Sequence, residues 1–164
     1  MMEPSPRCAY IALGSNLADP EAQVNHAFTA LAQLPQSRLL ARSSLYRSAP
    51  VGYAAQADFI NAVAQLETEL SAHDLLQSLL DIERTFGRVR DFRNAPRTLD
   101  LDLLLYADLM FHEPGLTLPH PRMHERAFVL LPLLEIAPDC ELPGKGKAKD
   151  WLMQVGDQTI TRVT

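Results

Sequence analysis

The sequence predicts an α+β domain in which helices pack on a mainly antiparallel sheet. Short segments with the apolar composition of strands and longer segments with an apolar stripe follow one another along the chain. Their order is strand, helix, strand, strand, helix, strand, which is the order of a ferredoxin-like β-α-β-β-α-β core. We therefore expect both helices on one face of the sheet, the other face free for function, and long loops that border a functional site.

The N-terminal part of the chain predicts one strand and one helix. The segment "CAYIAL" at residues 8–13 has the composition of a short buried strand, and the Gly-Ser-Asn triplet directly after it predicts a turn. Asp19 is a good N-cap, and Pro20 suits the first position of a helix. One apolar stripe continues from there until Pro35, which predicts that the helix ends before this residue.

The middle of the chain predicts two strands and a second helix. Residues 37–46 have a strand pattern, and the Pro, Gly and small residues of 48–58 predict a long loop. The segment "FINAVAQLET" at 59–68 predicts the next strand. Ser71 then caps a second amphipathic helix, and Gly87 ends it.

The next part of the chain predicts an Arg-rich loop, the fourth strand and a hairpin. The loop covers residues 88–96, the strand residues 98–106, and the hairpin residues 108–120. The pattern of 121–137 is helical, but a proline inside a helix removes a hydrogen bond and clashes with the preceding turn. We therefore expect two short helices, or a restart of the helix at Pro132.

Length and composition fit one domain without a membrane span. The chain has 164 residues, of which 47% are hydrophobic and 21% are charged, and no apolar run approaches the ~18 residues that a spanning helix needs. No secretory signal is recognisable near the first residue, which predicts a cytoplasmic protein. We expect a single domain over residues 1–164. Its core covers 8–139, and its C-terminal tail over 140–164 has a flexible basic linker and a helical turn around Trp151.

Two acids interrupt the strand-like stretch "RTLDLDLLLY" at residues 97–106. Because side chains alternate along a strand, Asp100 and Asp102 share one face, with about 6 to 7 Å between their backbone positions. The same alternation adds Leu104 and Tyr106 to that face. Mg²⁺ is held by one or two carboxylates together with phosphate oxygens, so the pair fits a metal site. A solvated edge strand is the alternative explanation of the two acids.

Arginine residues gather around this acid pair. The chain carries a net charge of −5, which argues against non-specific nucleic-acid binding, but 12 of its 15 basic residues are Arg. Seven of them fall within 43 residues that contain no Lys: Arg84, Arg88, Arg90, Arg93, Arg97, Arg122 and Arg126. Guanidinium groups grip phosphate at two points, and no Walker loop is present. The sequence therefore predicts a small polyanionic ligand that Arg side chains bind, with Arg122 and Arg126 on one face of a helix.

Two further residues are candidates for ligand contacts. His120 has Pro on both sides, and it is either a turn residue or a donor to phosphate. Asn61 shares its strand face with Phe59 and Val63. An amide in such a place is hydrogen-bonded either to the backbone or to the heteroatom edge of a planar ligand. The residues alone leave both alternatives open.

Several segments resemble the 6-hydroxymethyl-7,8-dihydropterin pyrophosphokinases of folate biosynthesis. The stretch "RNAPRTLDLDLL" at 93–104 is similar to the signature of that family, which is a basic residue, a small residue and then Pro-Arg-x-x-Asp-x-Asp before aliphatic residues. Further similar stretches occur in the family's order: "AYIALGSNL", "SSLYRSAPVG", "DFINAVAQLET", "IERTFGRVR" and "LTLPHPRMHERAFVLLPLLEIAPD". The resemblance covers residues 9–139.

The resemblance implies an ATP-dependent pyrophosphokinase, which transfers the diphosphoryl group of ATP to the hydroxymethyl oxygen of the pterin and releases AMP. It implies two Mg²⁺ ions held by Asp100 and Asp102, and a catalytic set made of these acids with Arg88 and Arg97. The implied nucleotide contacts are Glu83, Arg88, Arg90, Arg97, His120 and Arg126. The implied pterin contacts are Ser48, Pro50, Val51, Phe59, Asn61 and Phe128. We expect a monomer that binds these small molecules, and neither nucleic acid nor a membrane.

The residues themselves fit this chemistry, because phosphoryl-type transfer needs alignment and charge neutralisation more than a strong base. The loops 48–58 and 88–96 are expected to close over bound substrates. Two other functions stay open at this point. One is a metal-dependent phosphohydrolase that uses the same acids to activate water, and the other is a non-catalytic ferredoxin-like module that binds a nucleotide.

Overall fold

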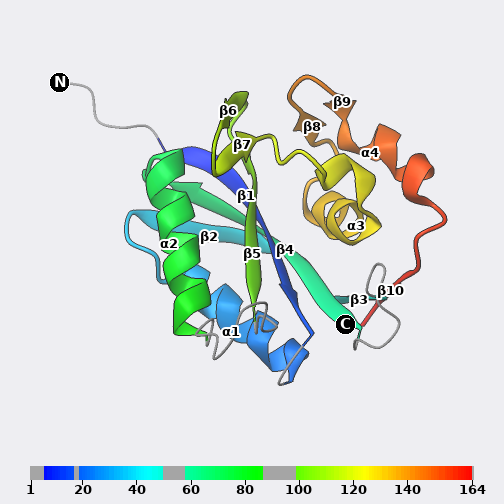
Figure 1. The fold of residues 1–164 in the computed structure, drawn as a ribbon, viewed down its shortest axis with the longest axis horizontal. Helices are drawn as coiled ribbons and strands as arrows, with labels where there is room; N and C mark the ends of the chain where they lie inside the picture. The colour runs from blue at the N-terminus through cyan, green and yellow to red at the C-terminus, as the bar shows by residue number, and fades with distance from the viewer. Residues whose placement is uncertain (1–5, 17–18, 50–57, 87–98, 164) are drawn as a thin grey trace.

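The computed structural model describes residues 6–16, 19–49, 58–86 and 99–163. Figure 1 shows their fold. The strands are β1 (Arg7–Ser15), β2 (Ser37–Arg42), β3 (Tyr46–Ser48), β4 (Phe59–Thr68), β5 (Asp100–Tyr106), β6 (Phe111–Glu113), β7 (Leu116–Leu118), β8 (Glu141–Leu142), β9 (Gly146–Lys147) and β10 (Ile160–Arg162). The helices are α1 (Pro20–Ala32), α2 (Ala72–Thr85), α3 (Ala127–Ile136) and α4 (Ala148–Trp151), with 3₁₀ turns η1 (Met123–Glu125) and η2 (Leu152–Val155).

An antiparallel sheet forms the centre of the described residues. Its strand order is β10-β3-β4-β1-β5, and β2 pairs with β4 as well. Every pairing in this sheet is antiparallel. The predicted α+β fold with a mainly antiparallel sheet is therefore confirmed. Among the helices of the described ranges, none is long and apolar enough to cross a membrane.

The two N-terminal helices begin where the sequence predicts. The carboxylate of Asp19 accepts a hydrogen bond from the backbone N–H of Ala22 at 3.4 Å, and Pro20 is the first residue of α1. The hydroxyl of Ser71 accepts one from the N–H of Asp74 at 3.1 Å at the start of α2. Both caps satisfy amide groups that have no partner inside the helix, so local sequence decides where these helices start.

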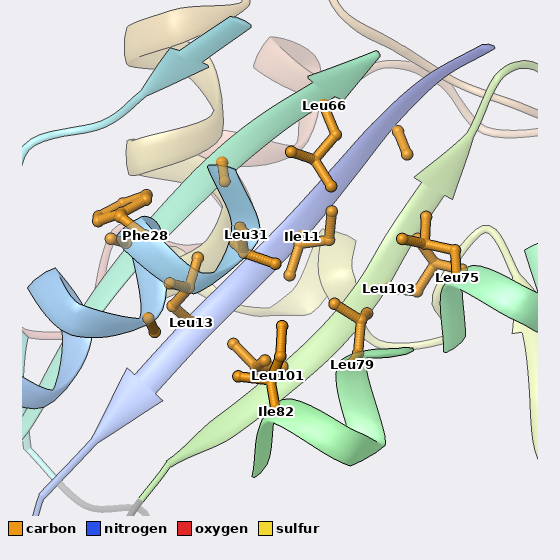
Figure 2. Packing of buried hydrophobic residues seen from close by; sticks show 14 of the residues in the cluster. Ile11, Leu13, Phe28, Leu31, Leu66, Leu75, Leu79, Ile82, Leu101 and Leu103 are labelled. Carbon is orange, nitrogen blue, oxygen red and sulfur yellow. The ribbon is translucent and has the colours of Figure 1, made fainter. Parts of the chain in front are cut away.

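Helices α1 and α2 cover one face of the sheet, as expected (Figure 1). Figure 2 shows part of the buried cluster that joins them to the strands. Alternate residues of β1 and β5 contribute Ile11, Leu13, Leu101 and Leu103 to this cluster. The other labelled residues come from α1, α2 and β4: Phe28, Leu31, Leu66, Leu75, Leu79 and Ile82. Period-two alternation thus supplies an apolar face that the amphipathic helices bury.

The expectation that the opposite face is left open is wrong where α3 packs (Figure 1). A second buried cluster joins Val63 of β4 and Leu104 of β5 to Leu130 and Leu133 of α3. The helix runs through Pro132, so the predicted restart there is wrong as well. The break lies instead at Arg126, between η1 and α3, where the backbone is extended. Burial of Leu130 and Leu133 offsets the one hydrogen bond that Pro132 removes.

Other expected boundaries move because of strand pairing. Gly14 does not end β1, since it pairs with β4 on one side and with β5 on the other. The strand expected over 37–46 is interrupted, because the Ser43 hydroxyl accepts a hydrogen bond from the N–H of Val63 at 2.9 Å. Ser43 lies between β2 and β3. Pairing across the sheet therefore overrides the local turn and strand propensities.

The C-terminal tail differs from the expected flexible linker. Residues of the basic segment form the hairpin β8–β9, and the helical turn predicted around Trp151 is α4 with η2 after it. The strand β10 was not predicted, and it joins the central sheet beside β3. The tail consequently returns to the central sheet and ends beside β3, which pairs with β4.

Candidate functional site

A pocket of about 710 Å³ opens on the α3-covered face of the sheet. Four strands, the segment around η1 and α3, and the C-terminal tail contribute to its wall. The lining residues are Ala12, Leu13, Gly14, Ser48, Ala49, Phe59, Asn61, Asp100, Asp102, Arg122, Glu125, Arg126, Ala127, Phe128, Gln158 and Thr159. The predicted acids, the predicted aromatic pair and Asn61 therefore line one pocket, although they lie far apart in the sequence.

Two small residues of β1 form the floor of this pocket. Gly14 pairs with Asp100 of β5 on one side and with Asn61 of β4 on the other, while Ala12 pairs with Asp102. Adjacent strands lie about 4.8 Å apart, so roughly 10 Å separates the backbones of Asp100 and Asn61. A methyl group on Gly14 would lie 3.5 Å from Asn61 Oδ1. The small floor residues keep the space between the acid pair and the amide free.

The acid pair has the arrangement that the sequence predicts. Asp100 is half-buried, Asp102 is exposed, and both line the pocket. Within the described ranges no group of three or more His, Cys, Asp or Glu residues could hold a metal ion. Two carboxylates fit Mg²⁺, because this ion completes its shell with water and phosphate oxygens.

One detail of the predicted face is wrong. The register of β5 on β1 shifts between Tyr10 and Ile11, so that these residues pair with Leu105 and Leu103 and leave Leu104 over as a bulge. Beyond the bulge the alternation is reversed. Tyr106 therefore does not share the face of the acids, and its hydroxyl donates to Leu70 O at 2.6 Å on the side of α2.

Glu83 supports β5 from the opposite face. This buried residue of α2 accepts a hydrogen bond from the N–H of Leu101, between the two acids, with 2.7 Å from Leu101 N to Glu83 Oε2. It is not among the residues that line the pocket. Its predicted place near a nucleotide stays a prediction, but its contact holds the backbone that carries the acid pair.

Two cationic side chains also line the pocket. The prediction that Arg122 and Arg126 share one face of a helix is wrong, because the 3₁₀ turn η1 lies between them. Both nevertheless line the pocket. The guanidinium carbon of Arg126 lies 5.5 Å from the ring centre of Phe128, which is a cation–π distance. Arg122 and Arg126 thus line the same pocket although they do not share a helix face, because the backbone at Arg126 is extended.

His120 lies next to this charged group. Its N–H donates to Leu104 O at 2.9 Å, and its Nδ1 accepts a hydrogen bond from the N–H of Arg122 at 3.2 Å. Burial lowers the pKa of His120; the charge of Asp102 opposes this effect, and those of Arg126 and Arg122 add to it. His120 is not among the residues that line the pocket. Its contact with phosphate stays a prediction.

The predicted pterin contacts that the structure describes lie together. Ser48, Phe59, Asn61 and Phe128 all line the pocket. The amide nitrogen of Asn61 donates to Ser48 Oγ at 2.7 Å, so part of its hydrogen bonding is satisfied inside the protein. The two half-buried aromatic rings come from β4 and α3. Five other predicted residues lie outside the described ranges: Pro50, Val51, Arg88, Arg90 and Arg97. Most of both predicted closing loops lies outside them too.

The comparisons with known proteins agree with this geometry. The family described as 7,8-dihydro-6-hydroxymethylpterin-pyrophosphokinase (HPPK) matches residues 10–138. The chain belongs to this family. A 2-amino-4-hydroxy-6-hydroxymethyldihydropteridine pyrophosphokinase of Pseudomonas aeruginosa is 52% identical to it, over 82% of this chain and 83% of the relative. The Haemophilus influenzae protein of the same name is 46% identical, over 94% of this chain and 97% of the relative. The predicted family and the predicted enzyme class, an ATP-dependent pyrophosphokinase, are confirmed.

A solved structure with the same fold belongs to a longer protein. The crystal structure of wild-type Plasmodium falciparum HPPK-DHPS with pteroate superposes with a TM-score of 0.73 at 12% sequence identity. The match covers 94% of this chain and 43% of that chain. This HPPK-family chain therefore spans less than half the length of that protein, and the likeness concerns the fold.

Sequence reasoning missed several pocket residues in this member of the HPPK family, among them Gly14, Glu125, Gln158 and Thr159. Gly14 was interpreted as a turn residue, although a glycine inside a strand also marks close approach of a ligand. Glu125 carried no pattern of its own. Gln158 and Thr159 lie in the tail, and no local signal places a tail beside a sheet. The pairing of β10 with β3 brings these two residues to the pocket.

Proposed function

We propose that this protein transfers the diphosphoryl group of ATP to the hydroxymethyl group of 6-hydroxymethyl-7,8-dihydropterin, giving AMP and the pterin diphosphate in folate biosynthesis. The single observation that carries the proposal is the shared pocket, in which the acid pair faces Asn61 across the small residues of β1. A triphosphate beside the acids and a planar ring beside the amide would have their reacting atoms between them.

The two substrates divide the pocket in this proposal. The pterin lies between Phe59 and Phe128, and Asn61 contacts its polar edge, with Ser48, Pro50 and Val51 beside it. Aromatic walls with few placed polar groups are typical of sites for planar ligands. ATP lies on the side of Asp100, Asp102 and Arg126. The other proposed nucleotide contacts are Glu83, Arg88, Arg90, Arg97 and His120.

Asp100 and Asp102 are proposed to hold two Mg²⁺ ions. Their support is the pair of carboxylates at alternate positions of β5, both of which line the pocket. Bound Mg²⁺ would neutralise phosphate charge and align the attacking and leaving oxygens. The two acids repel each other when both are ionised, so cation binding also removes a cost that the protein alone carries.

The protein's own groups contribute alignment and charge. In the proposed reaction the hydroxymethyl oxygen of the pterin forms a bond to the β-phosphorus of ATP and loses its proton. The bond from that phosphorus to the oxygen bridging to the α-phosphate breaks, and AMP leaves. Arg122 and Arg126 line the pocket, and we propose that their guanidinium groups take up charge on the phosphates. The loops 48–58 and 88–96 are proposed to close over the substrates and exclude water.

We also propose the finer features of the protein that accompany this function. The chain order β1-α1-β2-β4-α2-β5 and the sheet order β2-β4-β1-β5 support a ferredoxin-like core. One catalytic domain over residues 1–164 is proposed, because the tail strand β10 belongs to the same sheet. The proposed state is a cytoplasmic monomer whose partners are its two small-molecule substrates.

An assay of AMP release tests the proposal. Purified protein is incubated with ATP and Mg²⁺, with and without the hydroxymethyldihydropterin, and AMP and inorganic phosphate are measured. We expect AMP only when the pterin and Mg²⁺ are both present, in equal amount to the pterin diphosphate. Release of phosphate without pterin would instead identify a phosphohydrolase, and ATP binding without any turnover would identify a binding module.

A further inference from the structure

The C-terminal tail reaches the pocket through Gln158. This residue follows η2, where its N–H donates to Val155 O at 3.0 Å, and it precedes β10. In the sheet, Ile160 of β10 pairs with Ser48 of β3, whose hydroxyl accepts the hydrogen bond from Asn61. Gln158 is therefore held from both sides by ordered backbone, and it lines the pocket.

The amide group of Gln158 bonds to both peptide groups that flank Arg126. Its Nε2 donates to Glu125 O at 2.8 Å. Its Oε1 accepts from the N–H of Ala127 at 2.9 Å. The N–H of Ala127 is the first of α3, which has no acceptor inside its own helix. One side chain of the tail thus satisfies a donor and an acceptor on the two sides of a single residue.

These two hydrogen bonds stabilise the backbone conformation in which Arg126 lines the pocket. Arg126 has φ −124° and ψ 114°, an extended conformation between the 3₁₀ turn η1 and α3. If these residues were to continue as one helix, Glu125 O and the N–H of Ala127 would point along the helix axis in opposite directions. The Gln158 amide donates to Glu125 O and accepts from the N–H of Ala127, so both groups must point to the same side of the backbone. This requirement favours the extended conformation.

We propose that Gln158 is a positioning residue for the nucleotide side of the site, acting through Arg126. The inference rests on the proposed function, because it takes the Arg126 guanidinium as a contact of the ATP phosphates. A guanidinium group held in place before binding loses less conformational freedom when it grips phosphate. The tail is then part of the catalytic apparatus rather than an appendage of the core.

The test uses a substitution that keeps the volume of the side chain. Gln158→Met removes donor and acceptor but retains the length of the residue. Its matched control is Gln154→Met, because Gln154 is an exposed glutamine of the same tail that does not line the pocket. We expect Gln158→Met to lower kcat/KM for ATP about tenfold, with a smaller change in KM for the pterin, since misplacement of a contacting group reduces reactivity. The control is expected to retain wild-type constants.

A double-mutant cycle separates positioning from a general structural effect. If Gln158 acts through Arg126, then Gln158→Met in an Arg126→Ala background causes no further loss of kcat/KM for ATP. Losses that multiply, or an equal rise in both KM values, would overturn the proposal. Thermal unfolding of each variant accompanies the kinetics. A small fall of the midpoint is expected for Gln158→Met because two hydrogen bonds are lost, while the leucines that anchor α3 keep the protein folded.

The result is distinguishable from failure of the proposed function. Titration of the ATP analogue with a methylene group between the α- and β-phosphates measures nucleotide binding without turnover. If the wild-type protein binds this analogue but releases no AMP from ATP in the presence of the pterin and Mg²⁺, the proposed function fails, and the same titration of Gln158→Met still tests the positioning role. Equal affinity of wild type and Gln158→Met for the analogue, with equal kcat/KM, would refute the inference alone.

Discussion

The two faces of the central strands differ in what they bury. On the face covered by α1 and α2, the strands present large apolar residues that are buried in one cluster: Ile11, Leu13, Ile60, Leu101 and Leu103. On the other face, the neighbouring positions of the same strands hold small or polar residues: Ala12, Gly14, Asn61, Asp100 and Asp102. The large apolar residues stabilise the sheet, and the sheet in turn holds the small and polar residues of the pocket in place.

This difference teaches that stability and chemistry can be separated within a single strand. Neighbouring residues point to opposite faces. Substitutions at two adjacent positions of one strand are therefore expected to affect different properties, stability at one position and chemistry at the other. The acids of β5 repel each other, and the small floor residues of β1 bury little apolar area, which costs stability on the pocket face. The apolar cluster behind the sheet offsets this cost.

The largest expected effect comes from the acid pair. Asp100→Ala and Asp102→Ala are each expected to lower turnover by about a hundredfold or more, because each removes a ligand of the proposed Mg²⁺ ions, whose positive charge stabilises the transferred group. Both variants should remain folded, since neither side chain belongs to a buried cluster. Steady-state AMP release and circular dichroism check the two statements. Asp108→Ala, an exposed aspartate beyond the end of the same strand, is the control. Normal turnover in a folded acid variant would move the catalytic centre elsewhere.

The next effect should fall on stability and leave the chemistry intact. Ile11 is fully buried on the helix-covered face and adjoins Ala12 of the pocket floor. We expect Ile11→Ala to lower the free energy of unfolding by about 3 kcal/mol, because it opens a cavity in the leucine-rich cluster. Urea denaturation measures this loss, and kcat per folded molecule should be unchanged. A large fall in kcat at full folding would show that the two faces are not independent.

A smaller effect is expected from the amide of the pocket. Asn61→Ala should weaken binding of the pterin by about tenfold while ATP binding is kept, because one hydrogen-bonding partner is removed from one side of the pocket. Calorimetric titration with each substrate separates the two affinities. Gln65→Ala is a matched control, since Gln65 lies on the same face of β4 but outside the pocket. Loss of ATP affinity instead of pterin affinity would exchange the two proposed subsites.

The smallest effect is expected from the hydrogen bonds of Glu135, which connect α3 to Ser44 and Tyr46 beside the pocket face of the sheet. The carboxylate of Glu135 on α3 accepts hydrogen bonds from the hydroxyl of Tyr46 at 2.7 Å and from the N–H and hydroxyl of Ser44 at 3.0 Å. Burial opposes its charge, but these hydrogen bonds outweigh burial and lower the pKa of Glu135. Burial and the same carboxylate raise the pKa of Tyr46 to about 12.

The sign of the pH dependence follows from this direction. A carboxyl group whose pKa is lower in the folded state stabilises the fold above its ordinary pKa of 4.5, and this contribution is lost as the pH falls through the folded-state value. Glu135→Gln should therefore reduce the free energy of unfolding by about 1 kcal/mol at pH 7, a value discounted because the residue is exposed. Urea denaturation at pH 7 and at lower pH should show the difference from wild type shrinking. A constant difference, or an equal effect of Glu141→Gln, would contradict the assignment.

Local chemistry in the sequence determined much of this protein. The helix caps at Asp19 and Ser71, the strand Phe59–Thr68 and the shared face of Asp100 and Asp102 depend on neighbours within a few residues. Composition and residue order could therefore predict them. The family resemblance extended this to Asn61 and the aromatic pair, which the structure brings to the same pocket.

Tertiary structure alone decided the remaining features. The bulge that turns Tyr106 away from the acids arises from pairing with β1. The continuation of β1 through Gly14 requires partner strands on both sides. The return of the tail to β3, which brings Gln158 to Arg126, depends on contacts between residues more than thirty positions apart. Such contacts leave no periodicity or cap in the sequence, because their energy comes from the assembled sheet and not from adjacent residues.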